Sequence, residues 1–228
     1  MRKQQKIWKL EHTKLNSIPS IASPEPSSGV ISFVEFLREK EIDSPKKVID
    51  VACGQGRNAV YLAKEGFEVT GVDYIKEALQ QTQKLADNQG VSINLIESEI
   101  DKTWEFEDNH FDIAVDSFSS IDIETKKGRE IYRNEMLRTL KPGGYALIMV
   151  VSANDELESQ MIKESPGAEK NSTIWPDNQK FQKDYDEQEL REFYKDFKIL
   201  ELKEISKPAR KLGKDYTATN FWLVLQKQ

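Results

Sequence analysis

The sequence contains a single cysteine, Cys53, among its 228 residues. One cysteine cannot form an intramolecular disulfide or supply a cysteine-based zinc cluster, and it is typical of proteins from a reducing compartment. The chain also lacks any apolar run of about 18 residues, so no membrane span is expected. The first residues are basic but carry no apolar stretch of the kind that a secretory signal needs. We therefore expect a soluble, cytoplasmic protein.

Positively charged residues are also fewer than negatively charged ones. The 33 lysines and arginines are outnumbered by 39 aspartates and glutamates, which gives a formal net charge of −6. Binding to nucleic acid depends largely on neutralising phosphates, so this balance argues against a nucleic-acid partner. Residues 97–116 include eight acidic residues and one lysine, which makes that segment a poor surface for a phosphate backbone.

Two kinds of periodicity alternate between residues 47 and 151. Short apolar runs, typical of buried strands, are followed by segments whose apolar residues recur every three or four positions. We expect strands at residues 48–51, 67–73, 91–95, 111–115 and 145–151, and helices at residues 59–65, 78–89 and 126–140. A helix at residues 187–194 and strands at 199–205 and 220–225 complete the pattern. It predicts an α/β fold with a parallel sheet covered by helices on both faces.

Two segments show little periodicity. Residues 1–31 contain three prolines and only a weak helical pattern around Trp8, and we expect an N-terminal lid or extension there. Residues 32–228 then form one domain, whose first helix begins at Ser32 with a capping box to Glu35. Residues 152–186 are polar and are expected to be a substrate-lid insertion.

A basic connection between the last two expected strands is the other notable feature. It is either a solvated loop or a source of attraction for an anionic substrate, and its charged residues are Lys207, Arg210, Lys211 and Lys214.

Glycines mark the turn from the first strand to the first helix of the alternating region. The segment GQGRNA, residues 54–59, fits the dinucleotide fingerprint G-x-G-x-x-G/A, and Asp73 follows Gly54 by 19 positions. On this motif alone the chain would bind NAD. However, Asp50 stands at the start of the turn, where its carboxylate would repel a pyrophosphate and attract a cation.

Four segments in order, VIDVACGQG, VTGVD, DNHFDIAV and LRTLKPGGYALI, resemble the class I S-adenosylmethionine-dependent methyltransferases. The resemblance covers about residues 46–151. It implies a Rossmann-like fold with a seven-stranded, mostly parallel sheet, helices on both faces and an antiparallel last strand. Its cofactor, S-adenosyl-L-methionine, brings an ammonium and a sulfonium but no phosphate, and leaves as S-adenosyl-L-homocysteine. Residues 53–73 are further similar to small-molecule methyltransferases of the tellurite-resistance and thiopurine or thiol groups.

The resemblance also implies a set of cofactor-binding residues. Asp50 would lie near the ammonium, Arg57 near the carboxylate and Asp73 at both ribose hydroxyls. Tyr74 would flank the adenine. The adenine edge would meet Glu99, with the Ile100 N–H beside it, and Asp101 is the alternative. The remaining positions expected at the cofactor are Ala52, Gly54, Gly56 and Asp116. Cys53 is expected to be a small side chain under the cofactor, and no metal site is expected.

The methyl acceptor is expected over the end of the fourth strand, at residues 116–120. This segment lacks the N-P-P-Y type tetrapeptide of adenine-amino methyltransferases, which argues against that chemistry. Candidate catalytic residues are Asp116, His12 and Tyr185, and candidate substrate-binding residues are Ser117, Phe118 and Trp175. A thiol acceptor would need no strong base.

The sequence therefore predicts transfer of a methyl group to a small molecule by in-line displacement, a reaction that depends on alignment more than on acid–base groups. Two alternatives stay open: a methyltransferase of protein or RNA, and an adenosylmethionine-binding protein without activity. The acceptor atom, the substrate and the oligomeric state cannot be named from the sequence.

Overall fold

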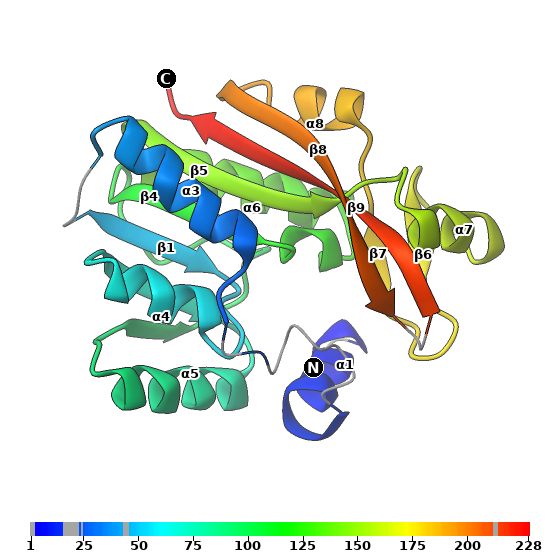
Figure 1. Ribbon diagram of the computed structural model, residues 1–228, viewed down its shortest axis with the longest axis horizontal. Coiled ribbons are helices and arrows are strands. Elements are labelled where there is room, and N and C mark those ends of the chain that lie inside the picture. The colour runs from blue at the N-terminus through cyan, green and yellow to red at the C-terminus, as the bar shows by residue number, and fades with distance from the viewer. Residues whose placement is uncertain (1–2, 16–22, 24, 43–45, 212–213) are drawn as a thin grey trace.

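The computed structural model describes residues 3–15, 23, 25–42, 46–211 and 214–228. Within these residues a seven-stranded sheet has the order β3-β2-β1-β4-β5-β9-β8. The first five strands in sequence are parallel, whereas β9 is antiparallel to both β5 and β8 (Figure 1). The predicted mostly parallel, Rossmann-like sheet with an antiparallel last strand is therefore confirmed. The strands are β1 (Lys47–Val51), β2 (Glu68–Asp73), β3 (Asn94–Glu97), β4 (Phe111–Ser117), β5 (Leu140–Val151), β8 (Lys198–Lys211) and β9 (Lys214–Gln226).

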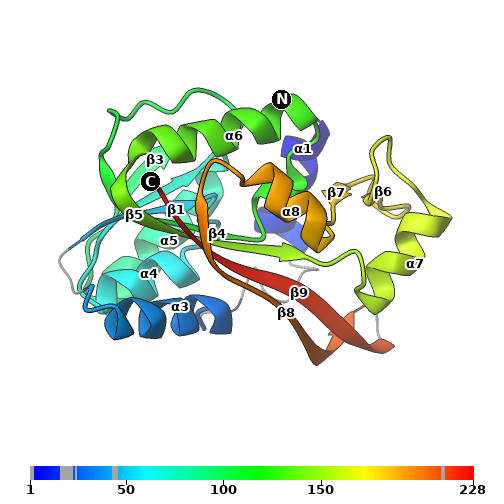
Figure 2. The same cartoon turned by 90° about the horizontal axis from the view of Figure 1, so that it is seen from above.

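Helices cover both faces of the sheet (Figure 2). On one face, α3 (Ser28–Glu39), α4 (Arg57–Lys64) and α5 (Lys76–Gln89) pack in a cluster that includes Val48. On the other face, α6 (Lys126–Thr139) and α8 (Glu187–Phe193) pack in a cluster that includes Ile49 and Val51. Because adjacent side chains of a strand point to opposite faces, β1 contributes apolar side chains to both cores, and Asp50 is its one buried polar residue.

The first helix of the domain differs from its prediction. Helix α3 begins at Ser28, after an extended Ser27 that makes no side-chain cap, so Ser32 and the predicted capping box lie inside the helix. Tertiary contacts explain the extra turn. The indole N–H of Trp222 donates to the carbonyl of Gly29 at 2.9 Å, and Val30 is fully buried.

Several strand predictions were also wrong in their limits, since β5 begins at Leu140 and not at 145, and β9 begins at Lys214 and not at 220. The third strand begins at Asn94, because Gly90 ends α5 in a left-handed conformation and Val91 still bonds back to that helix. At the other end of the chain, residues 207–211 belong to β8 and pair with β9, so the predicted basic connection is mostly a continuation of the hairpin. Residues 212 and 213, like the side chains of Lys211 and Lys214, lie outside the described part of the structure.

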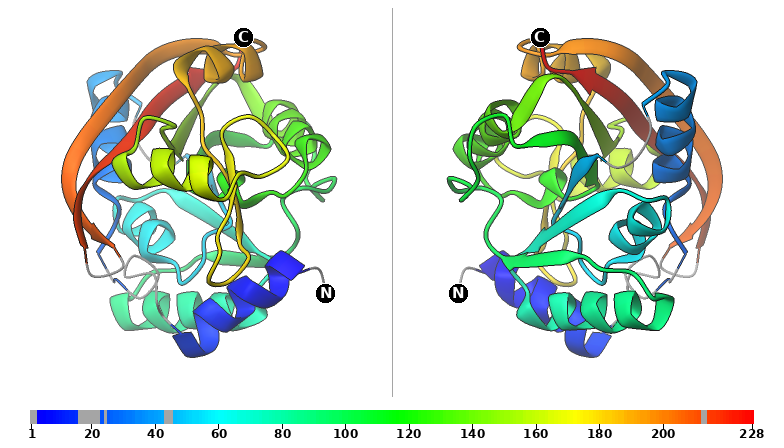
Figure 3. Two further views of the ribbon diagram at one scale, coloured as in Figure 1. Left: turned by 90° about the vertical axis from the view of Figure 1, so that its right-hand side faces the viewer. Right: turned by 90° about the vertical axis from the view of Figure 1, so that its left-hand side faces the viewer.

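The two segments of low periodicity contain regular structure. Helix α1 (Lys3–Leu10) includes Trp8 and continues as a π-helix, η1 (Glu11–Leu15). The insertion forms α7 (Glu156–Glu164) and a two-stranded antiparallel sheet of β6 (Ser172–Ile174) and β7 (Phe181–Lys183). In Figure 3 the β6–β7 hairpin reaches down to α1. Segments from opposite ends of the sequence thus meet beside the carboxyl ends of the parallel strands.

Candidate functional site

A cavity of about 270 Å³ lies at the carboxyl ends of β1, β2 and β4. This is the edge at which open α/β sheets bind their ligands, next to the point where the strand order reverses between β1 and β4. Its walls come from the turns after β1, β2, β3 and β4, from α1 and η1, and from the loop before β7. From the set predicted for cofactor, substrate and catalysis, the residues that line it are His12, Asp50, Ala52, Gly54, Arg57, Asp73, Tyr74, Ile100, Ser117 and Phe118.

The turn after β1 brings backbone to the cavity wall. Gly54 has φ +56°, and among the described residues a Cβ added there would meet only Cε1 of His12, at 3.4 Å. Ala52, which stands at a glycine position of the resembling family, also has a left-handed φ of 53°. For a residue with a side chain this conformation costs about 1–2 kcal/mol, which explains why that family uses glycine here.

Gly56 does not line the cavity. Its φ is +84°, and an added Cβ would lie 2.4 Å from Cγ2 of Thr82 on α5. The glycine therefore permits close packing of the start of α4 against α5. The Thr82 hydroxyl also donates to the carbonyl of Gly54 at 2.8 Å, so the same contact holds the turn in place.

Asp73, at the end of β2, ties this turn to its own strand. Its Oδ2 accepts the Gly54 N–H at 2.9 Å, and its Oδ1 accepts the Ile75 N–H at 2.8 Å. Burial raises the pKa of Asp73 to about 6, although these backbone N–H groups oppose the rise. Each carboxylate oxygen has a second lone pair, so both oxygens can accept a further hydrogen bond from a ligand hydroxyl.

Asp50 is the most perturbed carboxyl with a face on the cavity. It is 2% exposed, and burial, followed by the charge of Asp116, raises its pKa to about 7, while Arg57 opposes the rise. Its Oδ2 has no hydrogen-bond partner among the residues that the structure describes. A buried carboxylate in this state is stabilised by a cation that also donates hydrogen bonds, such as an ammonium. A pyrophosphate would raise its energy further.

The two acidic residues considered for the adenine edge differ in their position relative to the cavity, and the expected Glu99 is the one that does not line it. Asp101 is buried and lines the cavity beside Ile100. Glu99 does not line it; its Oε1 accepts a hydrogen bond from Nε2 of Gln5 at 3.0 Å. Arg57 lies at the start of α4, on the cavity wall, and burial lowers its pKa.

Three further candidates lie away from the cavity. Asp116 is completely buried, and its carboxylate accepts hydrogen bonds from the Tyr132 hydroxyl at 2.6 Å and the Ser119 N–H at 2.8 Å. These bonds fix the turn after β4, so Asp116 positions the cavity wall from behind. Tyr185 and Trp175 are buried but do not line the cavity.

Gln55 and Asn58 of the glycine motif and Ser119 of the expected acceptor segment also line the cavity. Other cavity residues come from segments without a motif, and they are Gln4, Gln5, Trp8, Ile121, Asp122, Ile123, Glu124 and Lys180. One signal was available in the N-terminal segment, because Gln4, Trp8 and His12 follow each other at intervals of four and therefore share one face of a helix. For Lys180, which comes from an aperiodic loop, no sequence signal was available.

Direct contacts join the two segments over the cavity. Nε2 of Gln4 donates to the carbonyl of Phe181 at 3.0 Å. Nζ of Lys180 lies 5.1 Å from the centre of the Trp8 ring, a cation–π geometry, and 3.5 Å from Oδ1 of Asp122. The β6–β7 hairpin is thereby connected both to α1 and to the turn after β4.

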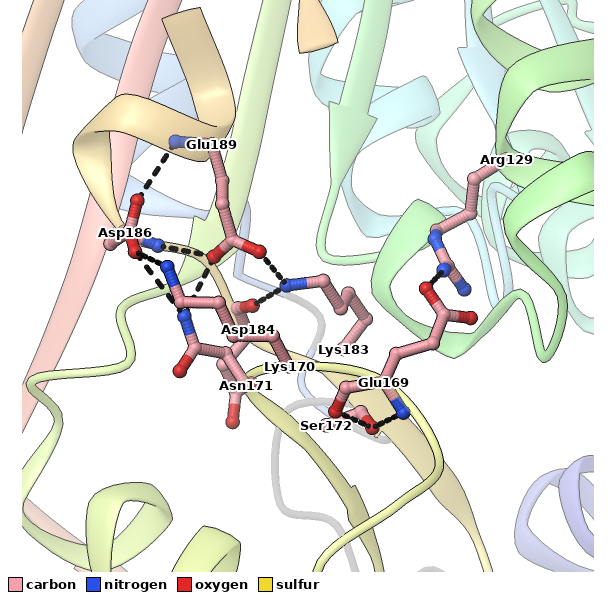
Figure 4. A network of polar contacts seen from close by, with 9 residues as sticks. All are labelled: Arg129, Glu169, Lys170, Asn171, Ser172, Lys183, Asp184, Asp186 and Glu189. Atoms are coloured by element: carbon pink, nitrogen blue, oxygen red, sulfur yellow. Dashed lines mark hydrogen bonds and ion pairs between the residues drawn. The ribbon is translucent and has the colours of Figure 1, made fainter. Parts of the chain in front are cut away.

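A polar network anchors the other side of the hairpin (Figure 4). Nζ of Lys183 is 3.0 Å from Oε1 of Glu189 on α8, and Arg129 on α6 forms an ion pair with Glu169. Asn171 also donates to Glu189, at 2.7 Å. These contacts attach the insertion to α6 and α8. Of its described residues, Lys180 lines the cavity.

Within the described part of the chain, no group of His, Cys, Asp and Glu side chains has the arrangement of a metal site. None of the helices that the structure describes has the length and apolarity needed to cross a membrane.

Comparisons with known proteins agree with this geometry. A family model described as a methyltransferase domain matches residues 48–144. TehB of Haemophilus influenzae, a probable S-adenosyl-L-methionine-dependent methyltransferase, is 27% identical over 164 residues, which are 72% of this chain and 50% of that protein. A methyltransferase structure from Methanosarcina mazei superposes with a TM-score of 0.74 at 22% identity, over 84% of this chain and 96% of the other.

A third similarity includes bound ligands. The 1,6-didemethyltoxoflavin-N1-methyltransferase of Burkholderia thailandensis, solved with its substrate and S-adenosylhomocysteine, has a TM-score of 0.63 at 17% identity. The superposition covers 88% of this chain and 79% of the chain of that methyltransferase. At these identities the two solved structures show a shared fold.

Residues 48–144 match a methyltransferase domain, and the sheet order and these similarities agree with the resemblance to the class I S-adenosylmethionine-dependent methyltransferases that the motifs predicted. Within that class it is similar to TehB. The chain spans about half the length of the curated relatives that it matches.

Proposed function

We propose that this protein transfers a methyl group from S-adenosylmethionine to a small molecule. One observation carries the proposal: a buried, unpartnered carboxylate oxygen of Asp50 faces a cavity whose turn exposes backbone at Gly54. That combination suits a cationic ligand at a site where a dinucleotide would place its phosphates. When bound, the cofactor supplies an electrophilic methyl group on a sulfonium; the chain's own residues bind, orient and shield the reactants.

The cavity residues fit such a cofactor. Asp50 would hold its ammonium, and Arg57 its carboxylate. Asp73 has one free lone pair on each oxygen for the two ribose hydroxyls, while both oxygens stay fixed by backbone N–H groups. Tyr74 would lie against the adenine.

For the adenine amino group we propose Asp101, because it lines the cavity and Glu99 does not. Asp101→Asn should weaken binding of S-adenosylhomocysteine about 10-fold or more, the equivalent of one hydrogen bond to a charged group. Glu99→Gln is the matched control and should change the affinity less than about 3-fold. The reverse order would contradict the assignment.

The size and cover of the cavity favour a small acceptor. Its volume is about 270 Å³, and α1, η1 and the β6–β7 hairpin close one side. We propose that residues 1–31 and 152–186 act as the lid of a single methyltransferase domain, with Ser117 and Phe118 beside the acceptor. Exclusion of water by such a cover favours alignment of the acceptor for in-line displacement.

Two measurements test the function. Titration calorimetry should show binding of S-adenosylhomocysteine and no binding of NAD. Incubation with methyl-labelled cofactor and cell extract should then place the label in the small-molecule fraction. Label in protein or RNA would favour the macromolecular alternative, and binding without any transfer would favour a protein that only binds the cofactor. Binding of NAD in place of S-adenosylhomocysteine would refute the proposal.

A further inference from the structure

We propose that His12 is the proton acceptor of the methyl-transfer reaction and that the substrate carries an N–H or O–H group at its methyl-accepting atom. This inference rests on the function proposed above. It assigns a catalytic residue to a segment that precedes the methyltransferase domain, and it distinguishes between classes of acceptor that the fold leaves open.

The position of His12 is the first observation. Its side chain lines the cavity, and its Cε1 lies 3.4 Å from the point where a Cβ of Gly54 would stand. The imidazole therefore lies against the turn after β1. The backbone carbonyl of His12 accepts a hydrogen bond from Nε2 of Gln81 on α5 at 3.0 Å, which fixes the backbone at this residue. The ring lies 6.1 Å from that of Trp8.

The state of the ring is the second observation. His12 is 8% exposed, yet its Nδ1 has no hydrogen-bond partner in the described ranges of the chain. Burial lowers the pKa of His12, and Glu11 partly opposes this change. The imidazole is thus neutral at neutral pH. In the tautomer that carries its proton on Nε2, Nδ1 has a lone pair available to a ligand.

A second unpartnered acceptor lies on the same face of the N-terminal segment. Gln4 is 6% exposed, and its Nε2 is occupied by the carbonyl of Phe181, which leaves Oε1 without a partner among the described residues. Two buried acceptors, Nδ1 of His12 and Oε1 of Gln4, call for a ligand that brings hydrogen-bond donors. A polar heterocycle or phenol with N–H or O–H groups meets this requirement, whereas a thiolate sulfur has no hydrogen to donate to either acceptor.

The proton transfer balances without any additional reactant. The acceptor atom forms its new bond to the methyl carbon with its own lone pair, and the electron pair of the broken carbon–sulfur bond stays on sulfur. The proton that the acceptor atom loses passes to Nδ1 of His12 and then to water. General-base assistance of this kind contributes about 10²–10⁴-fold to a rate.

The charged groups around His12 influence its pKa and therefore the pH dependence of the reaction rate. Its neighbours in the chain are Lys9 and Glu11, and Glu77 lies on α5. The titratable or charged groups that share the cavity with it are Asp50, Cys53 and Arg57 from β1 to α4, Asp73 and Tyr74 at the end of β2, Asp101 after β3, Asp122 and Glu124 after β4, and Lys180 before β7. Because the pKa is lowered, a rate that needs neutral His12 should rise with pH below about 6.5 and be level above it.

The decisive variant is His12→Asn, which keeps a polar side chain near Nδ1 but cannot take up a proton. His110→Asn is the matched control, because His110 lies among Phe106 and Phe111, away from the cavity residues. Both variants are first checked for binding of S-adenosylhomocysteine by calorimetry. Failure of the wild type to bind would refute the proposed function itself, and unchanged binding in His12→Asn would show that the site has kept its shape.

The transfer assay uses labelled S-adenosylmethionine with phenol, 4-hydroxypyridine and benzimidazole as O–H or N–H acceptors, and thiophenol and 2-mercaptoethanol as thiols. We expect label in at least one member of the first group. His12→Asn should lower its kcat about 100-fold or more, change KM less than about 3-fold, and abolish the rise of kcat below pH 6.5. His110→Asn should behave as the wild type. Label in thiols alone, label in no acceptor, or a normal kcat and pH profile for His12→Asn would overturn the proposal.

Discussion

The carboxyl of Asp50 gives the most demanding test of the proposed cofactor site. Its pKa of about 7 in the folded protein, against an ordinary value of 3.8, corresponds to about 4 kcal/mol of unfavourable energy for the ionised form. Without ligand, the contribution of Asp50 to the free energy of unfolding is therefore most favourable below pH 3.8. This contribution declines as the pH rises towards 7, because over this interval the folded state holds the proton more tightly than the unfolded state does.

An ammonium placed beside Asp50 would stabilise its ionised form. Ligand binding would therefore release the proton of the Asp50 carboxyl. With a pKa of about 7, Asp50 should release about 0.9 proton on binding at pH 6, about 0.5 at pH 7 and about 0.1 at pH 8. Titration calorimetry of S-adenosylhomocysteine, repeated in buffers of different ionisation enthalpy, measures this number directly. Asp73 also releases protons, so the informative quantity is the difference between the wild type and Asp50→Asn.

Asp50→Asn should have opposite effects on stability and on affinity. The free energy of unfolding at pH 8 should rise, by up to about 4 kcal/mol, because a penalised buried charge is removed. Affinity for S-adenosylhomocysteine should fall about 10- to 100-fold, the value of one hydrogen-bonded charge. Asp87→Asn, at an exposed position of α5, is the control and should change neither. Equal proton release in wild type and Asp50→Asn, or unchanged affinity, would refute the reasoning.

Two further predictions concern the turns that shape the cavity. Gly56→Ala should lower the free energy of unfolding by about 2–4 kcal/mol in urea titrations, since the new Cβ would meet Thr82 at 2.4 Å at a left-handed φ. Gly143→Ala, with φ +77° and no atom of the described residues within 4 Å of an added Cβ, isolates the backbone cost of about 1 kcal/mol; equal losses would contradict the contact with Thr82. Asp116→Ala should cost about 2–3 kcal/mol, because it leaves the buried Tyr132 hydroxyl without its acceptor, and a melting temperature equal to that of the wild type would show that this bond does not matter.

Much of the domain could be predicted because its signals are local. The apolar runs, the helical periodicity and the glycines at the turns predicted the parallel strands and the fold class, and the carboxylates at the ends of the first two strands predicted Asp50 and Asp73 at one site. The limits of elements failed where distant contacts decide them. Helix α3 starts four residues early because Trp222, almost 200 positions away, bonds to Gly29.

The sequence alone predicted the resemblance to one class of protein, because the motifs of a cofactor site at strand ends and tight turns lie in consecutive residues. It also gave the sign of the charge at the turn after the first strand, which favours a cationic ligand. Only the tertiary structure decided which acidic residue, Asp101 or Glu99, reaches the cavity, since that depends on how the turn after β3 folds against α1. It alone brought His12 and Lys180 to the same cavity, because they lie 168 positions apart in segments without motif and meet only through packing.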